Sequence, residues 1–302
     1  MKKDNNIHLV YNPSAGTGDE NAKEEIIATI EAHGHRCLYS SSKKKVLKGI
    51  EPQTDLIAIA GGDGTIRAVI LKLLNKKLKY KRPIAILPCG TANNIANSLG
   101  ISEHVSQNVA CWSNYQLTKF DVGQVLNLDN TKFFIESFGF GIFARLMTCM
   151  KKKKTNHINS PEEEFKMALD ELILQSKNYK AVSLRMKINN KIVEEDCILL
   201  EIMNSSSLGP RLKLSHNADP GDGYFDVILV SEAQRTLLEK YLMDIRANRE
   251  TIFPIKPIRV KSLEVTWNGN DLHVDDELIK NYKMNALNIS VLEGMLEMVV
   301  QK

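Results

Sequence analysis

The sequence of 302 residues lacks the patterns that mark several large classes of protein. Its five cysteines are widely separated and include no Cys-x-x-Cys pair, which favours reduced thiols over a disulfide framework. No apolar run approaches the roughly 20 residues of a membrane-spanning helix, and the one near the N-terminus is too short for a secretory leader. Basic residues exceed acidic ones by only four, 40 against 36, too few to indicate a nucleic-acid binder. We therefore expect a cytoplasmic protein with no nucleic-acid partner.

The familiar phosphate-binding motifs are missing as well. Because the chain contains no Gly-Lys dipeptide, it has no Walker A loop. The stretch GTGDEN (16–21) has Asn21 where a dinucleotide-binding fingerprint requires its third glycine. The HRD and DFG motifs of protein kinases are also absent. A phosphate site in this chain must therefore be built on a different loop.

What the sequence does contain predicts two domains, since domains average about 150 residues. Its 43% hydrophobic and 25% charged residues are ordinary for a globular protein and exclude collagen-like, disordered and coiled-coil classes. In the first hundred residues, short apolar runs alternate with helical patterns, which predicts a doubly wound α/β domain of the Rossmann-like or phosphofructokinase-like kind. The expected strands are 7–12, 36–40, 55–60 and 83–88.

After about residue 115 the pattern changes to strands joined by short connections, which favours antiparallel pairing. The expected strands are 120–128, 132–140, 182–189, 197–204 and 224–230, with helices around 161–176 and 232–247. We expect an α/β domain over 1–118 and a mostly antiparallel β-sandwich over 119–289. The alternating segment at the C-terminus, about 290–302, is expected to return to the first domain as its last strand.

The most informative motif is GGDGT at 61–65, which follows a buried strand and begins a helix. Its glycines let a polyanion approach the backbone closely, and a helix N-terminus attracts phosphate. Asp63 would repel phosphate, which indicates a partner for a metal ion or a hydroxyl group. The alternative is a tight turn in which Asp63 and Thr65 cap the helix.

Two further loops of small, donor-rich residues follow the first and the fourth expected strands: NPSAG (12–16) and GTANN (90–94). Loops that follow parallel strands open at the same carboxyl edge of the sheet, where α/β domains bind ligands. Three such loops together favour a nucleotide site. The ordinary alternatives are a turn at Asn12-Pro13 and an N-cap at Thr91.

The second half of the chain contains two acidic motifs. ADPGDGYFDV (218–227) places three aspartates around two glycines, and carboxylate with turn carbonyl oxygens suits a hard cation such as Mg²⁺. HVDDE (273–277) places three acidic residues in succession. The alternatives are a polar Asp-Gly turn for the first motif and a solvated acidic hairpin for the second.

These motifs together resemble one family. NPSAG, GGDGT, PCGTANNIANSLG, DPGDGYFDV and DDE occur in the order and approximate spacing of the diacylglycerol kinase catalytic-domain family. The chain is most similar to its bacterial soluble lipid kinase branch, and the resemblance covers essentially all 302 residues. GGDGT alone is shared with NAD kinases and 6-phosphofructokinases, but the chain lacks the Asn-Glu pair of NAD kinases.

The resemblance implies an ATP- and Mg²⁺-dependent kinase that phosphorylates a hydroxyl of diacylglycerol or a related lipid, in a cleft between the two domains. By motif, the nucleotide-binding residues would be Asn12, Gly16, Ser40, Gly62, Asp63, Gly64, Thr65 and Thr91. Asp222 would hold Mg²⁺ with the main-chain carbonyls of Asp219 and Tyr224, linked through water to Asp63.

The family's acidic triplet is Asp-Gly-Glu, so Asp275 and Glu277 match it while Asp276 replaces the glycine. The resemblance makes Asp275 the candidate general base and Glu277 the alternative. If position 276 is left-handed, aspartate tolerates that backbone better than most residues but at a cost.

A lipid substrate implies peripheral contact with the inner face of the membrane. The basic run Lys151 to Lys154 is a candidate for docking on anionic lipid, the alternative being a solvated loop. A homodimer is one further option. The rival functions are a sphingoid-base or ceramide kinase and a catalytically silent relative that binds nucleotide or lipid.

Overall fold

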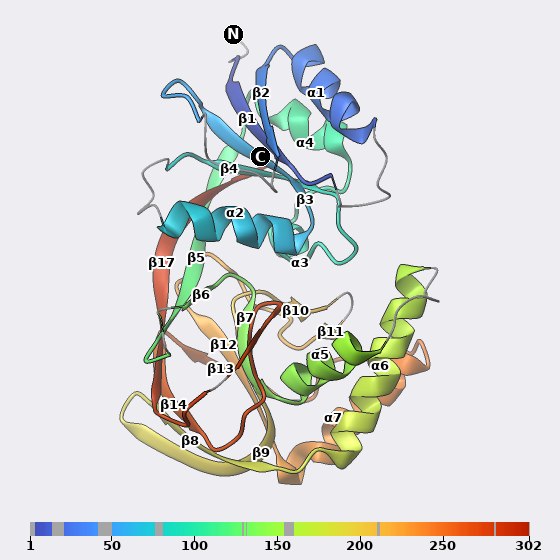
Figure 1. Cartoon of the computed structure of the whole chain (residues 1–302), viewed down its shortest axis with the longest axis vertical. Helices are drawn as coiled ribbons and strands as arrows, with labels where there is room; N and C mark the ends of the chain where they lie inside the picture. The colour runs from blue at the N-terminus through green and yellow to red at the C-terminus, as the bar shows by residue number, and fades with distance from the viewer. Residues whose placement is uncertain are drawn as a thin grey trace. The chain divides into compact units, whose positions relative to one another are not determined.

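In the computed structural model, the chain forms two compact units (Figure 1). The first takes in Met1–Asp121, Pro220–Asp222 and Glu293–Lys302, and the second takes in Val122–Asp219 and Gly223–Leu292. The structure describes residues 4–13, 21–41, 50–75, 81–128, 130, 132–153, 160–209, 212–280 and 282–301.

The first unit is built on a parallel sheet with the strand order β2-β1-β3-β4. These strands are β1 (Asn6–Tyr11), β2 (Arg36–Ser41), β3 (Leu56–Gly61) and β4 (Ile84–Pro88). Every residue of β3 and β4 is buried, as the continuous apolar runs predict for strands covered on both faces. The long strand β17 (Leu287–Val300) joins beside β4 in parallel, where Met298 pairs with Ile84.

Helices cover both faces of this sheet. Its described helices are α1 (Ala22–Ala32), α2 (Asp63–Asn75), α3 (Asn94–Ser98) and α4 (Val105–Cys111). Alternate residues of β3, such as Leu56 and Ala58, share a hydrophobic cluster with Ile30 of α1 and Val109 of α4. The apolar residues of α2 lie outside that cluster and pack on the other face of β3. The predicted doubly wound α/β domain is thereby confirmed.

The second unit is antiparallel in all of its described strand pairings. Its main path runs β16-β15-β7-β9-β8-β14-β17, with β12 on the other side of β9 from β7. Its strands are β5 (Gln116–Leu126), β6 (Lys132–Phe134), β7 (Ser137–Gly141), β8 (Val182–Ile188), β9 (Lys191–Met203), β12 (Phe225–Ser231), β13 (Ile258–Val260), β14 (Ser262–Trp267), β15 (Leu272–Val274) and β16 (Glu277–Ile279), together with the separate short pair β10 (Ser207–Leu208) and β11 (Leu212–Lys213). The predicted antiparallel β-sandwich is confirmed.

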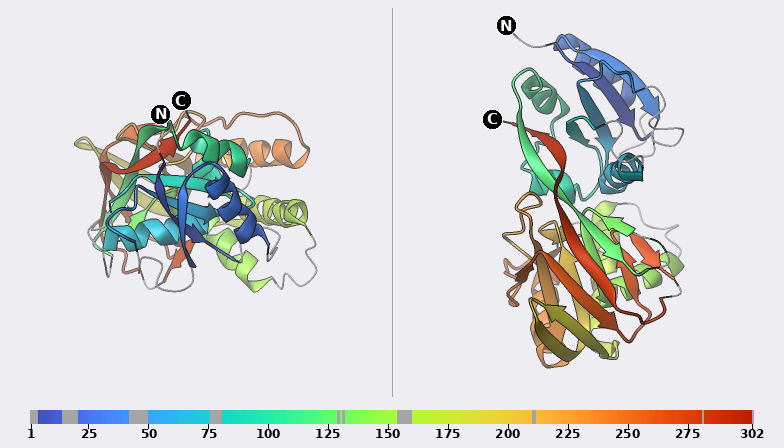
Figure 2. Two further views of the ribbon diagram at one scale, coloured as in Figure 1. Left: turned by 90° about the horizontal axis from the view of Figure 1, so that it is seen from above. Right: turned by 90° about the vertical axis from the view of Figure 1, so that its left-hand side faces the viewer.

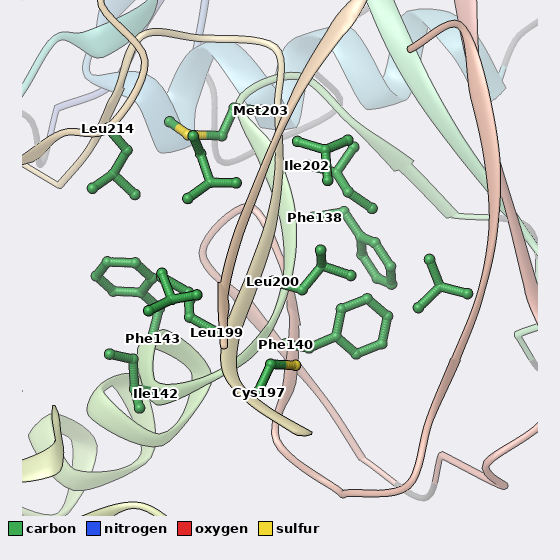
Figure 3. Close-up of a cluster of buried hydrophobic side chains, with 14 of the residues drawn as sticks. Phe138, Phe140, Ile142, Phe143, Cys197, Leu199, Leu200, Ile202, Met203 and Leu214 are labelled. Carbon is green, nitrogen blue, oxygen red and sulfur yellow. The ribbon is translucent and has the colours of Figure 1, made fainter. Parts of the chain in front are cut away.

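The core of the second unit is a large cluster of buried aromatic and aliphatic side chains (Figure 3). Phe138 and Phe140 of β7 pack edge to face, with ring centroids 5.0 Å apart. The unit also contains α5 (Ile142–Lys152), α6 (Pro161–Asn178), the short 3₁₀ helix η1 (Glu232–Gln234) and α7 (Arg235–Arg246). Along the described chain, no helix combines the length and apolarity needed to cross a bilayer.

Strands β5 and β17 each contribute residues to both units and run side by side (Figure 2). The part of β5 that belongs to the first unit ends at Asp121, and its buried carboxylate accepts a hydrogen bond of 2.6 Å from the backbone N–H of Gly294 in β17. The backbone N–H of Asp121 donates to the carbonyl of Pro220, also at 2.6 Å. Asp121 therefore joins the three chain segments of the first unit.

Candidate functional site

The three predicted loops follow β1, β3 and β4, which are neighbours in the sheet, so their described residues meet at its carboxyl edge. The loops after β3 and β4 touch through bare backbone. A Cβ atom added to Gly90 would lie 2.5 Å from the Cα of Gly62, and one added to Gly62 would lie 3.0 Å from the Cα of Gly90. Glycine is required on both sides of this contact because no side chain fits between the two loops.

A side-chain hydrogen bond joins the loop after β1 to the same site. Asn12 Nδ2 donates to Thr65 Oγ1 at 2.8 Å, and the Asn12 backbone N–H donates to the carbonyl of Ala60 at 3.1 Å. Thr65 itself is buried in the first turn of α2. Asn12, Gly62 and Thr65, all predicted as nucleotide-binding residues, are therefore brought together. Gly16, another predicted member, lies outside the described residues.

Asp63 has a structural role that the sequence did not predict. Its carboxylate accepts hydrogen bonds from the backbone N–H groups of Asn94 (2.9 Å) and Ile95 (3.1 Å), so it caps α3 from another loop. Burial raises the pKa of Asp63, while the amide donors oppose the shift. The alternative in which Thr91 caps this helix is wrong, because the N-cap position is Asn93, with a left-handed φ of 50°.

Three other residues predicted to bind nucleotide, Gly64, Thr91 and Ser40, lie at exposed positions or on the edge strand of the sheet. Gly64 is exposed in the first turn of α2, and Thr91 is exposed in the loop after β4. Ser40 lies on the edge strand β2, where its hydroxyl is 2.9 Å from Nε2 of His8. Burial lowers the pKa of His8, so this imidazole is held in its neutral form.

In the second unit, Asp275 and Asp276 form the two-residue turn of the hairpin between β15 and β16. Asp275 has a left-handed backbone, with φ of 49°, whereas Asp276 does not have a positive φ. The strain considered for position 276 therefore falls on the preceding residue. Aspartate is one of the few residues with a side chain that adopts this conformation readily.

The carboxylate of Asp275 is buried and occupied by backbone donors. It accepts hydrogen bonds from the N–H groups of Ile135 (3.2 Å), Glu136 (2.9 Å) and Ser137 (3.1 Å). Three successive amides that point at one carboxylate form an anion-binding nest. The expected alternative, a solvated acidic hairpin, is therefore wrong for Asp275.

Glu277 has the opposite environment. Its side chain is 48% exposed, and its Oε1 atom lies 3.4 Å from Nζ of Lys132. Both groups also line a cavity of about 690 Å³ in the second unit, together with Leu128, Ile279 and Tyr282. Glu277 therefore presents a solvated carboxylate at the edge of a partly apolar cavity.

The loop predicted to hold Mg²⁺ contains two exposed carboxylates, Asp219 and Asp222, and a left-handed glycine, Gly223, with φ of 77°. Tyr224 is exposed, and the guanidinium of Arg259 lies 4.6 Å from its ring centroid. No cluster of three or more His, Cys, Asp or Glu side chains placed to hold a metal ion occurs among the described residues. Carboxylate and carbonyl oxygens remain a donor set that suits Mg²⁺ chemically.

The third aspartate of that motif has a different partner. Asp226, at the start of β12, is buried and accepts a hydrogen bond from the hydroxyl of Ser215. The guanidinium of Arg259 lies 3.9 Å from its other carboxylate oxygen. Asp226 therefore stabilises the strand.

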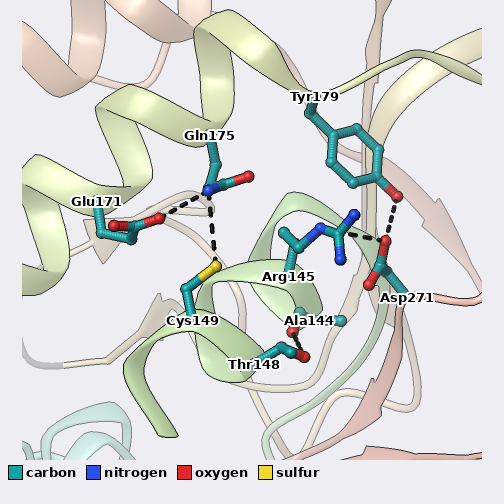
Figure 4. A network of polar contacts seen from close by, with 8 residues as sticks. All are labelled: Ala144, Arg145, Thr148, Cys149, Glu171, Gln175, Tyr179 and Asp271. Atoms are coloured by element: carbon teal, nitrogen blue, oxygen red, sulfur yellow. Dashed lines mark hydrogen bonds and ion pairs between the residues drawn. The ribbon is translucent and has the colours of Figure 1, made fainter. Parts of the chain in front are cut away.

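The basic run at the end of α5 is only partly available to an external partner. Nζ of Lys153 lies 2.7 Å from the buried carboxylate of Glu171 on α6, which Gln175 also contacts at 2.6 Å (Figure 4). Lys151 and Lys152 are exposed in the last turn of α5. Lys154 lies outside the described residues. Lys153 therefore connects α5 to α6.

Two family models match this chain, and each matches mostly one of the two units. A model described as the diacylglycerol kinase catalytic domain matches residues 6–125, and one described as the YegS C-terminal NAD kinase beta sandwich-like domain matches residues 147–296. With these two domains in this order, the chain belongs to the diacylglycerol kinase catalytic-domain family, as the motifs predicted. The expectation that it is an enzyme, a lipid kinase by family, is confirmed with it.

Individual relatives are similar over almost their whole length. A diacylglycerol kinase of Staphylococcus saprophyticus is 23% identical over 291 residues, which cover 93% of this chain and 92% of the relative. A diacylglycerol kinase of Staphylococcus haemolyticus is 24% identical over 293 residues, covering 93% and 84%.

Solved structures are similar in fold. A diacylglycerol kinase from Bacillus anthracis str. Sterne superposes with a TM-score of 0.69 at 17% identity, covering 99% of this chain and 97% of that one. A second crystal structure from the same organism gives a TM-score of 0.74 at 19% identity, covering 99% and 98%. The likeness supports the two-domain architecture predicted from the sequence.

Proposed function

We propose that this protein is an ATP- and Mg²⁺-dependent kinase that phosphorylates a hydroxyl group of diacylglycerol or a closely related lipid. The observation that carries the proposal is the contact between the loops after β3 and β4, where Gly62 and Gly90 leave bare backbone at the carboxyl edge of a parallel sheet. Such an edge is where phosphates bind in α/β domains. The relatives named diacylglycerol kinase suggest the acceptor class.

The first unit supplies the nucleotide site in this proposal. The N-terminus of α2, which begins within the GGDGT loop, offers amide donors and a partial positive charge to phosphate. Asn12 and Thr65 hold the loop after β1 against this helix. Asp63 orders the loop after β4 by capping α3, so its role toward a metal-bound water would be additional to a structural one.

The second unit supplies the base, and the geometry favours Glu277 over Asp275. A general base needs a lone pair that can take the proton of the acceptor hydroxyl. The lone pairs of Asp275 are engaged by three backbone amides, whereas Glu277 is half exposed beside a cavity. We therefore propose that Glu277 accepts the proton and that Asp275 fixes the hairpin.

Mg²⁺ would be held by Asp222 with the main-chain carbonyls of Asp219 and Tyr224. The exposed carboxylates and the turn carbonyls of this loop are hard oxygen donors of the kind that Mg²⁺ prefers. A bound Mg²⁺ supplies positive charge that offsets the charge on phosphate oxygens.

The cavity beside Glu277 is our candidate for the acceptor's polar end. Leu128, Ile279 and Tyr282 offer apolar contact, and Lys132 and Lys280 offer positive charge. Peripheral contact with an anionic bilayer would use the exposed Lys151 and Lys152, each worth about 1 kcal/mol near such a surface.

The test is a transfer assay with purified protein, γ-labelled ATP, Mg²⁺ and vesicles of phosphatidylglycerol that contain diacylglycerol, ceramide or a sphingoid base. We expect Mg²⁺-dependent transfer of label to diacylglycerol, with mass identification of the product. Substitution of Lys151 and Lys152 with glutamine should weaken sedimentation with these vesicles and reduce the salt sensitivity of binding. Label on ceramide or the sphingoid base instead would change the acceptor, and nucleotide binding without transfer to any lipid would indicate a silent relative.

A further inference from the structure

Three neighbouring strands of the second unit place a buried histidine and a buried glutamate over a glycine. In the register of the sheet, Glu201 of β9 pairs with Gly139 of β7, and Gly139 pairs in turn with His273 of β15. The side chains of Glu201 and His273 meet, with Nε2 of the imidazole 2.9 Å from Oε1 of the carboxylate. A Cβ atom on Gly139 would lie 2.0 Å from that same oxygen. The missing side chain of Gly139 therefore makes room for the pair.

The pair is enclosed by the core of the unit. The side chains of His273 and Glu201 are 3% and 0% exposed. The second carboxylate oxygen of Glu201, Oε2, is buried and makes no hydrogen bond among the described residues. Glu201 interrupts the otherwise apolar stretch CILLEIM (197–203), so its acidic side chain replaces a hydrophobic residue in a buried strand.

The other nitrogen of His273 reaches the hairpin that carries the candidate base. Nδ1 of His273 lies 2.8 Å from the backbone carbonyl oxygen of Asp275. A carbonyl oxygen can only accept, so Nδ1 carries a proton. The contact between Nε2 and Glu201 needs a second proton, on either the imidazole or the carboxyl group. In both arrangements the pair holds one proton more than a neutral histidine with an ionised glutamate.

The backbone N–H, the carboxylate and the backbone carbonyl of Asp275 are therefore each held by hydrogen bonds. Its backbone N–H donates to the carbonyl of Ser137 at 2.8 Å, its carboxylate lies in the amide nest, and its carbonyl accepts from His273. After this carbonyl the hairpin continues through the exposed residues Asp276 and Glu277, and Glu277 pairs with Val274 across the turn. Because Asp275 is the first residue of this two-residue turn, the position of its carbonyl affects the direction in which Glu277 leaves the turn.

We propose that His273 and Glu201 are positioning residues that hold the carbonyl of Asp275 and thereby set the orientation of Glu277 toward the acceptor hydroxyl. The inference rests on the proposed kinase function, in which Glu277 is the base. A buried ion pair adds little net stability compared with apolar side chains of the same size, but it can fix one arrangement against others. Small displacements of a catalytic group have large effects on rate, about 100-fold for 1 Å.

The two nitrogens of His273 can be replaced separately. The amide nitrogen of asparagine occupies the place of Nδ1, and that of glutamine occupies the place of Nε2. His273→Asn therefore keeps the donor to the Asp275 carbonyl, whereas His273→Gln keeps the contact with position 201. Both are made in a Glu201→Gln background, so that neither variant leaves an unpaired charge in the core.

Activity and hairpin order are then measured on the intact protein. We expect kcat for lipid phosphorylation to be about 10- to 100-fold lower in Glu201→Gln/His273→Gln than in Glu201→Gln/His273→Asn, with little difference in KM for ATP. Amide hydrogen exchange in a peptide covering 272–279 should be faster in the glutamine variant than in the asparagine variant. As a control for general destabilisation, Val230→Ala removes buried volume on β12, across β9 from β7, and should leave exchange of 272–279 unchanged.

Equal kcat and equal exchange in the two double variants would overturn the proposal, because the hairpin bond would then have no separate effect. The exchange measurement does not depend on activity. If exchange changes as expected but the wild-type protein transfers phosphate to no lipid, the positioning of the hairpin stands and the kinase proposal fails.

Discussion

At the scale of single residues, two carboxylates of one hairpin have opposite surroundings. Asp275 is 7% exposed and accepts from three backbone amides, and Glu277 is exposed beside Lys132. A carboxylate enclosed by amides serves the backbone, since removing it would leave buried N–H groups without partners. A carboxylate in contact with solvent can exchange its partners and so can accept a proton during a reaction.

We therefore predict different outcomes for Asp275→Asn and Glu277→Gln. The first variant tolerates the left-handed backbone and keeps one acceptor oxygen, but it turns an NH2 group toward the N–H of Ile135 and removes the negative charge from the nest, so the free energy of unfolding should fall by about 1–3 kcal/mol. The second should leave stability nearly unchanged, because an exposed pair with Lys132 contributes little, while kcat falls by about 100-fold or more. Urea unfolding and steady-state kinetics would measure the two effects. Loss of kcat in Asp275→Asn with unchanged stability would return the role of base to Asp275.

At the scale of elements, the contact between two loops depends on the absence of side chains. We predict that Gly90→Ala raises KM for ATP more than Gly62→Ala, because the added Cβ would lie 2.5 Å rather than 3.0 Å from the facing Cα. An increase of roughly tenfold is expected for the first variant, since the loops must separate to relieve the overlap. Kinetics at saturating lipid, with circular dichroism to verify folding, provide the measurement. Equal KM values in both variants and the wild type would place the nucleotide elsewhere.

The sequence predicted most elements because their patterns are strong. The apolar runs at 55–60 and 83–88 became β3 and β4, and the alternating stretch at 287–300 became β17. The convergence of loops at one edge followed from the parallel connection of strands.

The sequence pattern did not predict contacts between residues that are far apart in the chain, or contacts that depend on which residues of neighbouring strands lie opposite each other. Asp63 caps a helix 31 residues away, a distance at which local capping rules give no signal. The left-handed residue is Asp275 because the turn has two residues and pairs Val274 with Glu277, which the sequence alone does not specify. The pair of Glu201 and His273 requires the register of three strands. The sequence contained one indication of this pair, because Glu201 is an acidic residue inside the apolar stretch of β9.

At the scale of the whole molecule, the buried pair makes stability depend on pH. Burial opposes the charged form of His273, but the attraction and hydrogen bond of Glu201 outweigh it and raise the pKa of the imidazole. The folded state then binds a proton that the unfolded state loses above about pH 6.5. The contribution is fully present below that pH and is lost as the pH rises toward the pKa of the folded state.

We predict that the free energy of unfolding falls as the pH rises above about 6.5, the ordinary pKa of histidine, at up to about 1.4 kcal/mol per pH unit. The titration of His8, whose lowered pKa acts below this range, does not interfere. The control is the variant Glu201→Gln/His273→Asn, which lacks the titrating imidazole and should show a flatter profile. Urea unfolding at several pH values measures both. Parallel profiles for the two proteins would contradict the proton-holding pair.

Strands β5 and β17 also bear on the order in which the protein can be made. The first unit needs Leu296 and Met298, which are buried in it, yet these residues are synthesised after the whole of the second unit. While the second unit is being synthesised, β4 therefore does not yet have β17 as its neighbour in the parallel sheet. The unit that contains β1 to β4 is therefore completed after the second unit, and a ribosome-bound chain that stops before residue 293 carries an incomplete first unit.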